Sequence, residues 1–216
     1  GLENYAFNLS YLIFNLIGGI GGLWVAHAKW GGFKSAVGKG ISFLALGLLG
    51  QGFGLIIWTY YNLALKVEIP YPSLADIGYF ALIPFYTLAM LNFARACGAK
   101  FALRSIQGKL QVVVIPTAIL LLSYALFIKD VGFDSHNLLK SFLDFSYPAG
   151  EAISVSLGLL TFTLSRNLLG GKMKQRIIFI ILALTFQYLT EFTFLYTSGK
   201  GIYYNASFVD LMYAGS

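Results

Sequence analysis

Two carboxylates of this chain stand within long apolar stretches. Glu191 lies deep inside the run 177–197, which contains no other charged residue, and Glu151 is close to the start of the run 148–165. A carboxylate in a membrane interior is energetically costly and is therefore a candidate for binding or transport. The alternative is that Glu191 is protonated, or hydrogen-bonds Gln187 or a tyrosine, and serves only to fix helix packing.

Polar amides and aromatic residues accompany these acids. Gln51 and Gln187 occupy corresponding places in two apolar runs, and amides at such depth normally hydrogen-bond across helices. We predict a ligand site, open to the outside, in the outer half of a helix bundle. The interfacial belt of Trp and Tyr is the alternative explanation for its aromatic members. The predicted site comprises Gln51, Trp58, Tyr61, Glu151, Gln187 and Glu191.

A Ser-x-x-Asp motif occurs twice, as Ser73 to Asp76 and as Ser207 to Asp210. In a capping box the serine side chain accepts from an amide in the first turn, and the acid reaches back to the amide of the serine. We interpret all four residues as helix caps, with the carboxylates also placed favourably for the helix dipole. The stretch from 147 to 151, which ends at Glu151, is interpreted as a third helix start with an acid.

Other chemistries lack the residues they need. His27 and His136 are predicted at opposite membrane faces, which argues against a paired haem site, and Cys97 is the only cysteine. The sequence has no phosphate-binding glycine loop, zinc spacing or nucleophile motif. Its basic residues never form the stripe of a nucleic-acid-binding protein. We therefore expect no enzyme activity, no metal, no cofactor and no nucleic-acid partner.

The composition indicates that a bilayer surrounds most of the chain, because 57% of the residues are hydrophobic and only 11% are charged. A spanning helix needs about 20 apolar residues. Six such runs are predicted, at 4–27, 41–61, 75–95, 110–128, 148–165 and 177–197, and a seventh helix begins near Ser207. The expected fold is an all-α polytopic transmembrane bundle, formed by a single domain over 1–216 and cut within its seventh helix.

Charge alternates between the predicted loops. Three loops are basic and hold most of the 15 Lys and Arg residues, whereas the loops between them hold acids. Because basic loops stay in the cytoplasm, the sequence predicts a multi-pass protein of the cell membrane with an external N-terminus. The basic loops contain Lys29, Lys34 and Lys39; Arg95, Lys100, Arg104 and Lys109; and Arg166, Lys172, Lys174 and Arg176. The acidic loops contain Glu68 and Asp76; Asp130, Asp134 and Asp144; and Asp210.

Two segments, 54–80 and 190–214, align as a weak internal repeat. In each, aromatic residues end a helix, a polar loop with one lysine follows, and Ser-x-x-Asp begins the next helix. The copies lie four spans apart and share one orientation. The repeat is therefore parallel and relates helices two and three to helices six and seven, unlike the inverted repeats of many transporters.

Helices one and two are rich in glycine. Small residues at four-residue spacing allow the backbones of membrane helices to approach closely. We expect these two helices to pack tightly on each other or on a second subunit. The glycines are Gly18, Gly19, Gly21 and Gly22 in the first helix, and Gly47, Gly50, Gly52 and Gly54 in the second.

The run PYPSLADIGYF, followed by the apolar IPFYTLAMLNF, resembles the outer loop of seven-helix membrane sensor modules at the N-termini of bacterial signalling proteins. FLDFSYPAGEAISVSLGLL resembles the fifth helix of that family, and NASFVDLMY resembles its seventh. In the family the module precedes PAS, histidine kinase or diguanylate cyclase domains. The resemblance spans about 40–214. It implies a sensor and transfers no catalytic residue, and no output domain is present in the 216 residues.

The leading functional hypothesis is a sensory or receptor-like membrane module, in which a ligand bound in the outer half of the bundle biases helix packing that is read at the cytoplasmic end. One alternative is a non-catalytic accessory subunit of a larger membrane complex. Another is a small-solute transporter with Glu191 on its path. The bilayer is the expected partner; a homo-oligomer, and a cytoplasmic signalling domain after Ser216, are left open.

Overall fold

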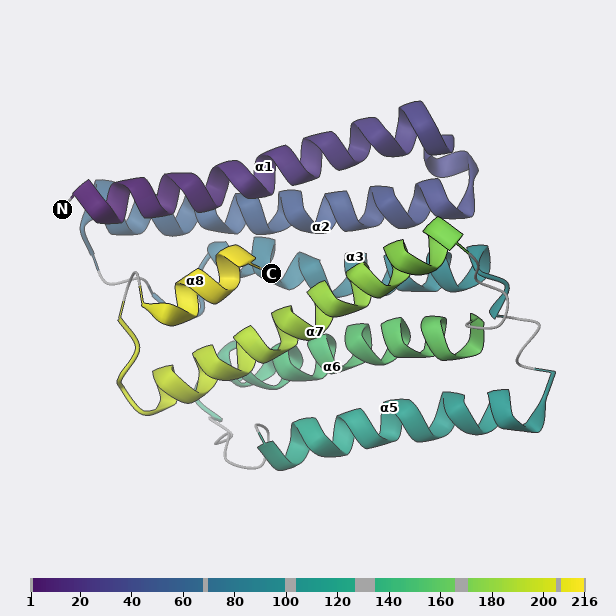
Figure 1. Ribbon diagram of the computed structural model, residues 1–216. Helices are drawn as coiled ribbons and strands as arrows, with labels where there is room; N and C mark the ends of the chain where they lie inside the picture. Colours follow the sequence, from purple (N-terminus) through teal and green to yellow (C-terminus); the bar gives the residue numbers. More distant parts are fainter. Residues whose placement is uncertain are drawn as a thin grey trace. The chain divides into compact units, whose positions relative to one another are not determined.

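The computed structural model describes residues 2–67, 70–99, 104–126, 135–165, 171–204 and 207–215 (Figure 1). Within these ranges the secondary structure is helical and contains no strand, so the all-α prediction is confirmed. The α helices are α1 (Leu2–Trp30), α2 (Ala36–Thr59), α3 (Ala75–Ala96), α5 (Ile106–Leu126), α6 (Leu138–Ser165), α7 (Gly171–Gly199) and α8 (Phe208–Gly215). Of the predicted loop charges, Glu68, Lys100, Asp130, Asp134 and Arg166 lie outside the described residues.

Five segments of the described chain are long and apolar enough to cross a bilayer. The chain is therefore a multi-pass helical membrane protein, as predicted. The sixth predicted span, 148–165, belongs to α6, which contains Lys140, Asp144 and Glu151 and is not among the five. The spanning segments are Leu12–Trp30, Ala36–Leu65, Ala75–Ala96, Ile106–Ala125 and Ile178–Ser198.

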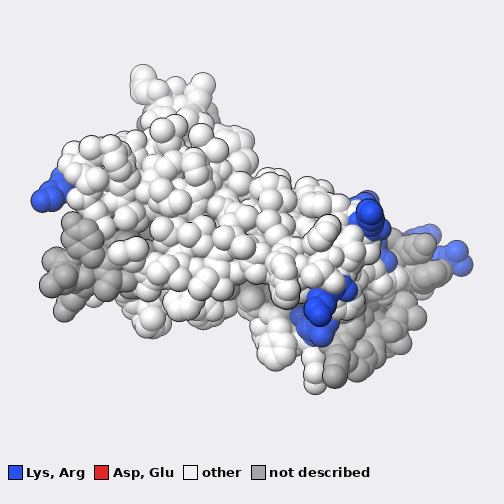
Figure 2. Space-filling view, turned by 90° about the horizontal axis from the view of Figure 1, so that it is seen from above, with Lys and Arg blue, Asp and Glu red and all other residues white. Residues whose placement is uncertain are grey.

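Side-chain exposure agrees with a lipid environment. On α5, the side chains of Val113 and Leu121 are 64% and 62% exposed. The small polar side chains of Ser123 on α5, Ser141 on α6 and Thr190 on α7 are buried. Membrane helices pack through small and polar residues because their large apolar side chains can remain in lipid. On the face shown in Figure 2, most of the described surface belongs to uncharged residues.

The chain forms two compact units. Unit 1 is Gly1–Ala89 with Phe133–Asp144, and unit 2 is Met90–Gly132 with Phe145–Ser216. The division falls inside α3 and inside α6, so each of these helices contributes residues to both units.

Unit 1 is built on glycine contacts. Helix α1 lies alongside α2 (Figure 1), and a Cβ added to Gly19 would come within 2.6 Å of Leu49. The close packing predicted for the first two helices therefore occurs within the chain. Helix α3 crosses α2 more closely still, because a Cβ on Gly78 would meet the carbonyl oxygen of Gly50 at 2.4 Å and the amide nitrogen of Gly54 at 2.5 Å.

The turn between α1 and α2 depends on two backbone features. Gly31 and Gly32 have φ values of 73° and 54°, a left-handed conformation that glycine adopts without steric cost. They precede and begin the short 3-10 helix η1 (Gly32–Lys34). Ser35 then caps α2, because its hydroxyl accepts from the Gly38 amide at 2.9 Å. The same hydroxyl donates to the carbonyl of Trp30.

Helix α2 ends later than predicted. It continues beyond Tyr61 as a π-helix, η2 (Tyr60–Leu65), and closes at Lys66, whose φ is 53°. The turns of a π-helix are wider than those of an α-helix, and the spacing of apolar residues in the sequence does not predict where such a turn occurs.

Helix α6 begins at Leu138, well before the predicted start at 148. Asn137 caps it, because its side-chain oxygen accepts from the Lys140 amide at 3.0 Å. Pro148 therefore lies inside the helix, as prolines in membrane helices often do. Two predictions are corrected as a result. Asp144 belongs to a helix rather than to a loop, and Glu151 is an interior residue rather than part of a helix start.

In unit 2, α7 packs against both α6 and α5. A Cβ on Gly158 of α6 would lie 3.5 Å from Ile181 and from Leu184 of α7. The hydroxyls of Ser123 on α5 and Tyr188 on α7 are 2.7 Å apart in a buried hydrogen bond. Such a bond between membrane helices limits how they rotate against each other.

Candidate functional site

Glu151 is the most unusual side chain of unit 2. It is only 5% exposed, and its Oε2 atom is buried and has no hydrogen-bond partner. Its neighbours along α6 include Ala152 and Ser154, which are also buried. Buried carboxylate oxygens in proteins are almost always paired, because an unpaired one loses its hydration without compensation. The structure therefore leaves an open acceptor at this position.

Glu191 of α7 lies within electrostatic reach of Glu151. Its Oε1 atom is 3.4 Å from Nε2 of Gln187, one helical turn earlier on α7, and Gln187 is buried. Tyr213 of α8 forms a hydrogen bond with the Glu191 side chain. Three helices thus contribute to one group of polar side chains, which we call the acid cluster: Glu151, Gln187, Glu191 and Tyr213.

The acid cluster contains no basic side chain. In the part of the chain that the structure describes, no salt bridge reaches the cluster, and the salt bridge between Lys140 and Asp144 lies outside it. No group of three or more His, Cys, Asp or Glu residues suited to a metal ion occurs in these ranges either. The cluster can therefore accept hydrogen bonds or a positive charge, but its geometry is not that of a transition-metal centre.

Aromatic contacts hold α8 against the end of α7. The Phe194 ring meets the Tyr203 ring edge to face at a centroid distance of 5.1 Å and the Tyr213 ring at 6.1 Å. Such pairs each contribute about 0.5–1.5 kcal/mol beyond the area they bury. Because Tyr213 also hydrogen-bonds Glu191, the position of α8 is tied to the acid cluster.

The two Ser-x-x-Asp motifs have similar but unequal geometries. Asp76 Oδ2 accepts from the Ser73 amide at 2.7 Å, and Asp210 Oδ2 accepts from the Ser207 amide at 3.0 Å. The Ser73 hydroxyl also accepts from the Ala75 amide at 3.2 Å, whereas the Ser207 hydroxyl is buried without a partner. The carboxylate half of the capping box is therefore present in both copies, and the hydroxyl contact in the first alone.

Each copy of the repeat also contains a tyrosine that binds an aspartate. In the second copy, the Tyr203 hydroxyl and Asp210 Oδ1 are 3.0 Å apart. Burial, and then the charge of Asp210 and this hydrogen bond, raise the pKa of Tyr203 above its usual range. Tyr203 therefore stays a neutral donor at physiological pH.

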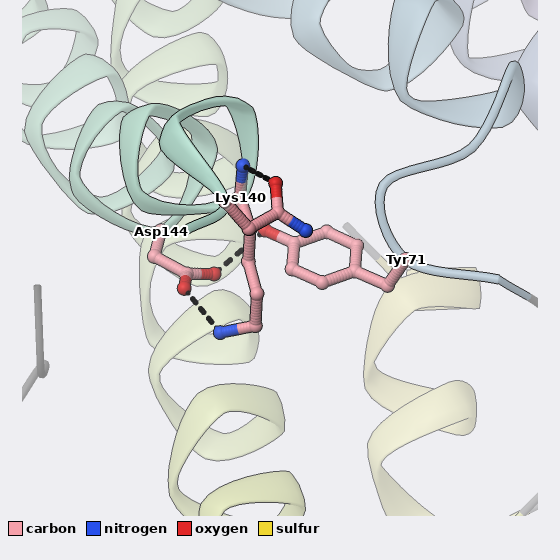
Figure 3. Close-up of polar contacts among 4 residues, drawn as sticks. Tyr71, Lys140 and Asp144 are labelled. Carbon is pink, nitrogen blue, oxygen red and sulfur yellow. Dashed lines mark hydrogen bonds and ion pairs between the residues drawn. The ribbon is translucent and has the colours of Figure 1, made fainter. Parts of the chain in front are cut away.

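In the first copy the tyrosine reaches a different helix. The Tyr71 hydroxyl donates to Asp144 Oδ1 at 2.7 Å, and Lys140 Nζ donates to Asp144 Oδ2 at 2.8 Å (Figure 3). The Lys140 ammonium also lies 5.9 Å from the centroid of the Tyr71 ring. Both carboxylate oxygens of Asp144 are thus occupied, and the loop before α3 is fastened to the first turns of α6.

Replacing Tyr71 with Phe is expected to loosen this loop without unfolding the protein. The substitution removes one solvent-exposed hydrogen bond to a charged acceptor, which contributes about 1 kcal/mol or less. Amide hydrogen exchange at Tyr71, Ser73 and Leu74, which unlike Pro70 and Pro72 have a backbone N–H, should become several-fold faster. Tyr60→Phe, at an exposed tyrosine of the same unit, is the control and should leave this exchange unchanged. Equal exchange in Tyr71→Phe and wild type would show that the contact does not hold the loop.

The structure brings together three of the six residues predicted for a ligand site: Glu151, Gln187 and Glu191, all in unit 2. The other three, Gln51, Trp58 and Tyr61, belong to unit 1. Gln51 is buried in α2, whereas Trp58 and Tyr61 are partly exposed near its end.

Sequence reasoning missed Tyr213, although the repeat contained a signal for it. Tyr213 follows Ser207 at the spacing by which Tyr79 follows Ser73. Tyr79 packs on the preceding helix of its copy, because a Cβ on Gly54 would lie 2.8 Å from the Tyr79 ring. The alignment of 54–80 with 190–214 already pairs Tyr213 with Tyr79, and this pairing indicates that Tyr213 packs on α7.

No protein-family model matches the chain, and no curated protein or solved structure is significantly similar to it. The fold and the site together define the class, a multi-pass helical membrane protein with a buried glutamate, Glu151, in its second unit.

Proposed function

We propose that the chain is a sensory or receptor-like membrane module whose ligand binds at the acid cluster. The observation that carries this proposal is the buried, unpartnered Oε2 of Glu151. A protein that needed the acid only for packing would be expected to pair it, because breaking or omitting a buried partner is strongly destabilising. A ligand that donates a hydrogen bond or carries positive charge would supply the missing partner.

The cluster offers a route from binding to a change in helix packing. Glu191 interacts with Glu151 and with Tyr213, so a ligand at the two acids competes with the contact that ties α8 to α7. A ligand shifts such an equilibrium only by its difference in affinity for the two arrangements. The proposed signal is a movement of α8 relative to α7. The cell membrane as location, and an orientation with the basic loops in the cytoplasm, belong to the same proposal.

Transport of a small solute is the second candidate, because Glu191 is a carboxylate within a segment apolar enough to span a membrane. Proteoliposomes distinguish the two functions. A sensor binds ligand without accumulating it inside the vesicle, whereas a transporter accumulates it, and Glu191→Gln abolishes the uptake.

A thermal-unfolding screen tests the proposed function directly. The purified protein in nanodiscs is incubated with primary amines, guanidinium compounds and small alcohols. Compounds that bind the cluster should raise the unfolding midpoint by several degrees in wild type but not in Glu151→Gln. Asp144→Asn, which changes a carboxylate on the same helix outside the cluster, should keep the response. Compounds that stabilise wild type and Glu151→Gln equally would place the ligand elsewhere.

A further inference from the structure

The acid cluster has more hydrogen-bond acceptors than donors. Glu151 and Glu191 contribute four carboxylate oxygens, while Gln187 and Tyr213 contribute the donors, and both donors interact with Glu191. Oε2 of Glu151 is left without a partner. What the cluster lacks is therefore a group that offers positive charge or a proton on the Glu151 side.

Among the residues that the structure describes, no Lys, Arg or His forms a salt bridge with Glu151 or Glu191. On α7 the nearby titratable groups are Glu191 and Tyr188, and Tyr188 is bonded to Ser123 of α5. On α8 they are Tyr213 and Asp210, and Asp210 is engaged by Tyr203 and by the Ser207 amide. These groups are acidic or neutral. Two carboxylates in a low-dielectric site repel each other unless a proton or a cation lies between them.

The amount of positive charge that the acid cluster lacks indicates which kind of cation would fit it. The two donors already stabilise one of the carboxylates, that of Glu191. Calcium takes six to eight oxygen ligands, and magnesium usually keeps several waters. Two acids, with no third His, Cys, Asp or Glu grouped with them in the described ranges, suit a single positive charge better.

We propose that Glu151 and Glu191 bind one small monovalent cation, an alkali ion or a primary ammonium ion, in exchange for one proton. In this exchange the Glu151 carboxylic acid loses its proton to solvent, and the carboxylate accepts the cation. Charge is conserved, because one positive charge leaves the site as one enters. The inference rests on the proposed function and specifies the ligand of the same site.

Proton release on cation addition is the decisive measurement. The full chain in weakly buffered nanodiscs receives NaCl or ethylammonium chloride, with N-methylglucamine chloride keeping the ionic strength constant. About one proton per protein should appear on saturation, and the apparent affinity should rise about tenfold per pH unit while the site is protonated. The two salts distinguish an alkali ion from an ammonium ion, because the true ligand binds with the higher affinity.

Variants test the assignment to these residues. Glu151→Gln should abolish both the proton release and the cation-induced rise in the unfolding midpoint, and Glu191→Gln should weaken binding at least tenfold. Asp144→Asn should behave like wild type. If Glu151→Gln does not fold, the wild-type measurement still decides the question. Absence of proton release with both salts overturns the exchange, and the proposed function survives that result if a neutral donor from the thermal screen still binds.

Discussion

Gly78→Ala is expected to lower the free energy of unfolding of unit 1 by about 2 kcal/mol, within the range for overpacked interiors. The added methyl would lie 2.4 Å from the Gly50 carbonyl oxygen, 2.5 Å from the Gly54 amide nitrogen and 2.9 Å from the Gly54 Cα. All three atoms belong to the backbone of α2, so no side-chain rotation can relieve the overlap. Helices α2 and α3 would have to separate along their crossing.

The matched control is Gly21→Ala. Gly21 is also a helical glycine of unit 1, and a Cβ there would meet nothing within 4 Å. Replacing a helical glycine with alanine at an unhindered position normally stabilises by about 0.5–1 kcal/mol. Reversible unfolding in bicelles measures both variants. Equal stability of Gly78→Ala and Gly21→Ala would show that the close crossing of α2 and α3 is not a feature of the folded protein.

Glu151→Leu is expected to stabilise the protein while abolishing its response to ligand. The carboxylate is buried and one of its oxygens has no partner. Replacing it with a side chain of similar volume removes an uncompensated desolvation penalty of about 1–3 kcal/mol. A gain in stability accompanied by a loss of function is typical of a residue retained for binding.

Asp144→Leu is the matched control and should have the opposite sign. It lies on the same helix, but its carboxylate receives hydrogen bonds from Tyr71 and Lys140, which leucine cannot accept. Unfolding midpoints of the two variants, measured in the same nanodiscs with and without cation, provide the comparison. A loss of stability in Glu151→Leu comparable to that in Asp144→Leu would identify Glu151 as a structural residue.

The helical architecture was predictable because a membrane-spanning run is a local property of the chain. Five of the six predicted runs correspond to helices that are long and apolar enough to span a bilayer. The start of α6 was not predictable in this way, because Lys140, Asp144 and Pro148 resemble a polar loop followed by a helix start. In the folded protein, Lys140 and Asp144 pair one turn apart on the helix, so the helix continues through them.

The candidate site was predictable in part, because a polar residue within an apolar run is also a local property of the chain. Glu151, Gln187 and Glu191 stand out as polar residues in apolar runs, and the four-residue spacing of Gln187 and Glu191 places them on one helix face. Their interaction across helices was a hypothesis until the packing was known. Tyr213 was missing from the predicted site although the repeat pairs it with Tyr79, because its contact with Glu191 depends on the return of α8 against α7 after the turn at Gly201, whose φ is 66°.

By itself, the sequence determined that this is a membrane protein, the approximate position of most of the described helices, and the costly acids among them. These properties follow from the hydrophobicity of about 20 consecutive residues at a time. Only the tertiary structure decided that Gly78 crosses Gly50 and Gly54, that Asp144 is fully paired, and that Oε2 of Glu151 is not. The reason is physical: hydropathy determines whether a helix enters the bilayer, whereas the contacts of its faces depend on side chains distant in the sequence.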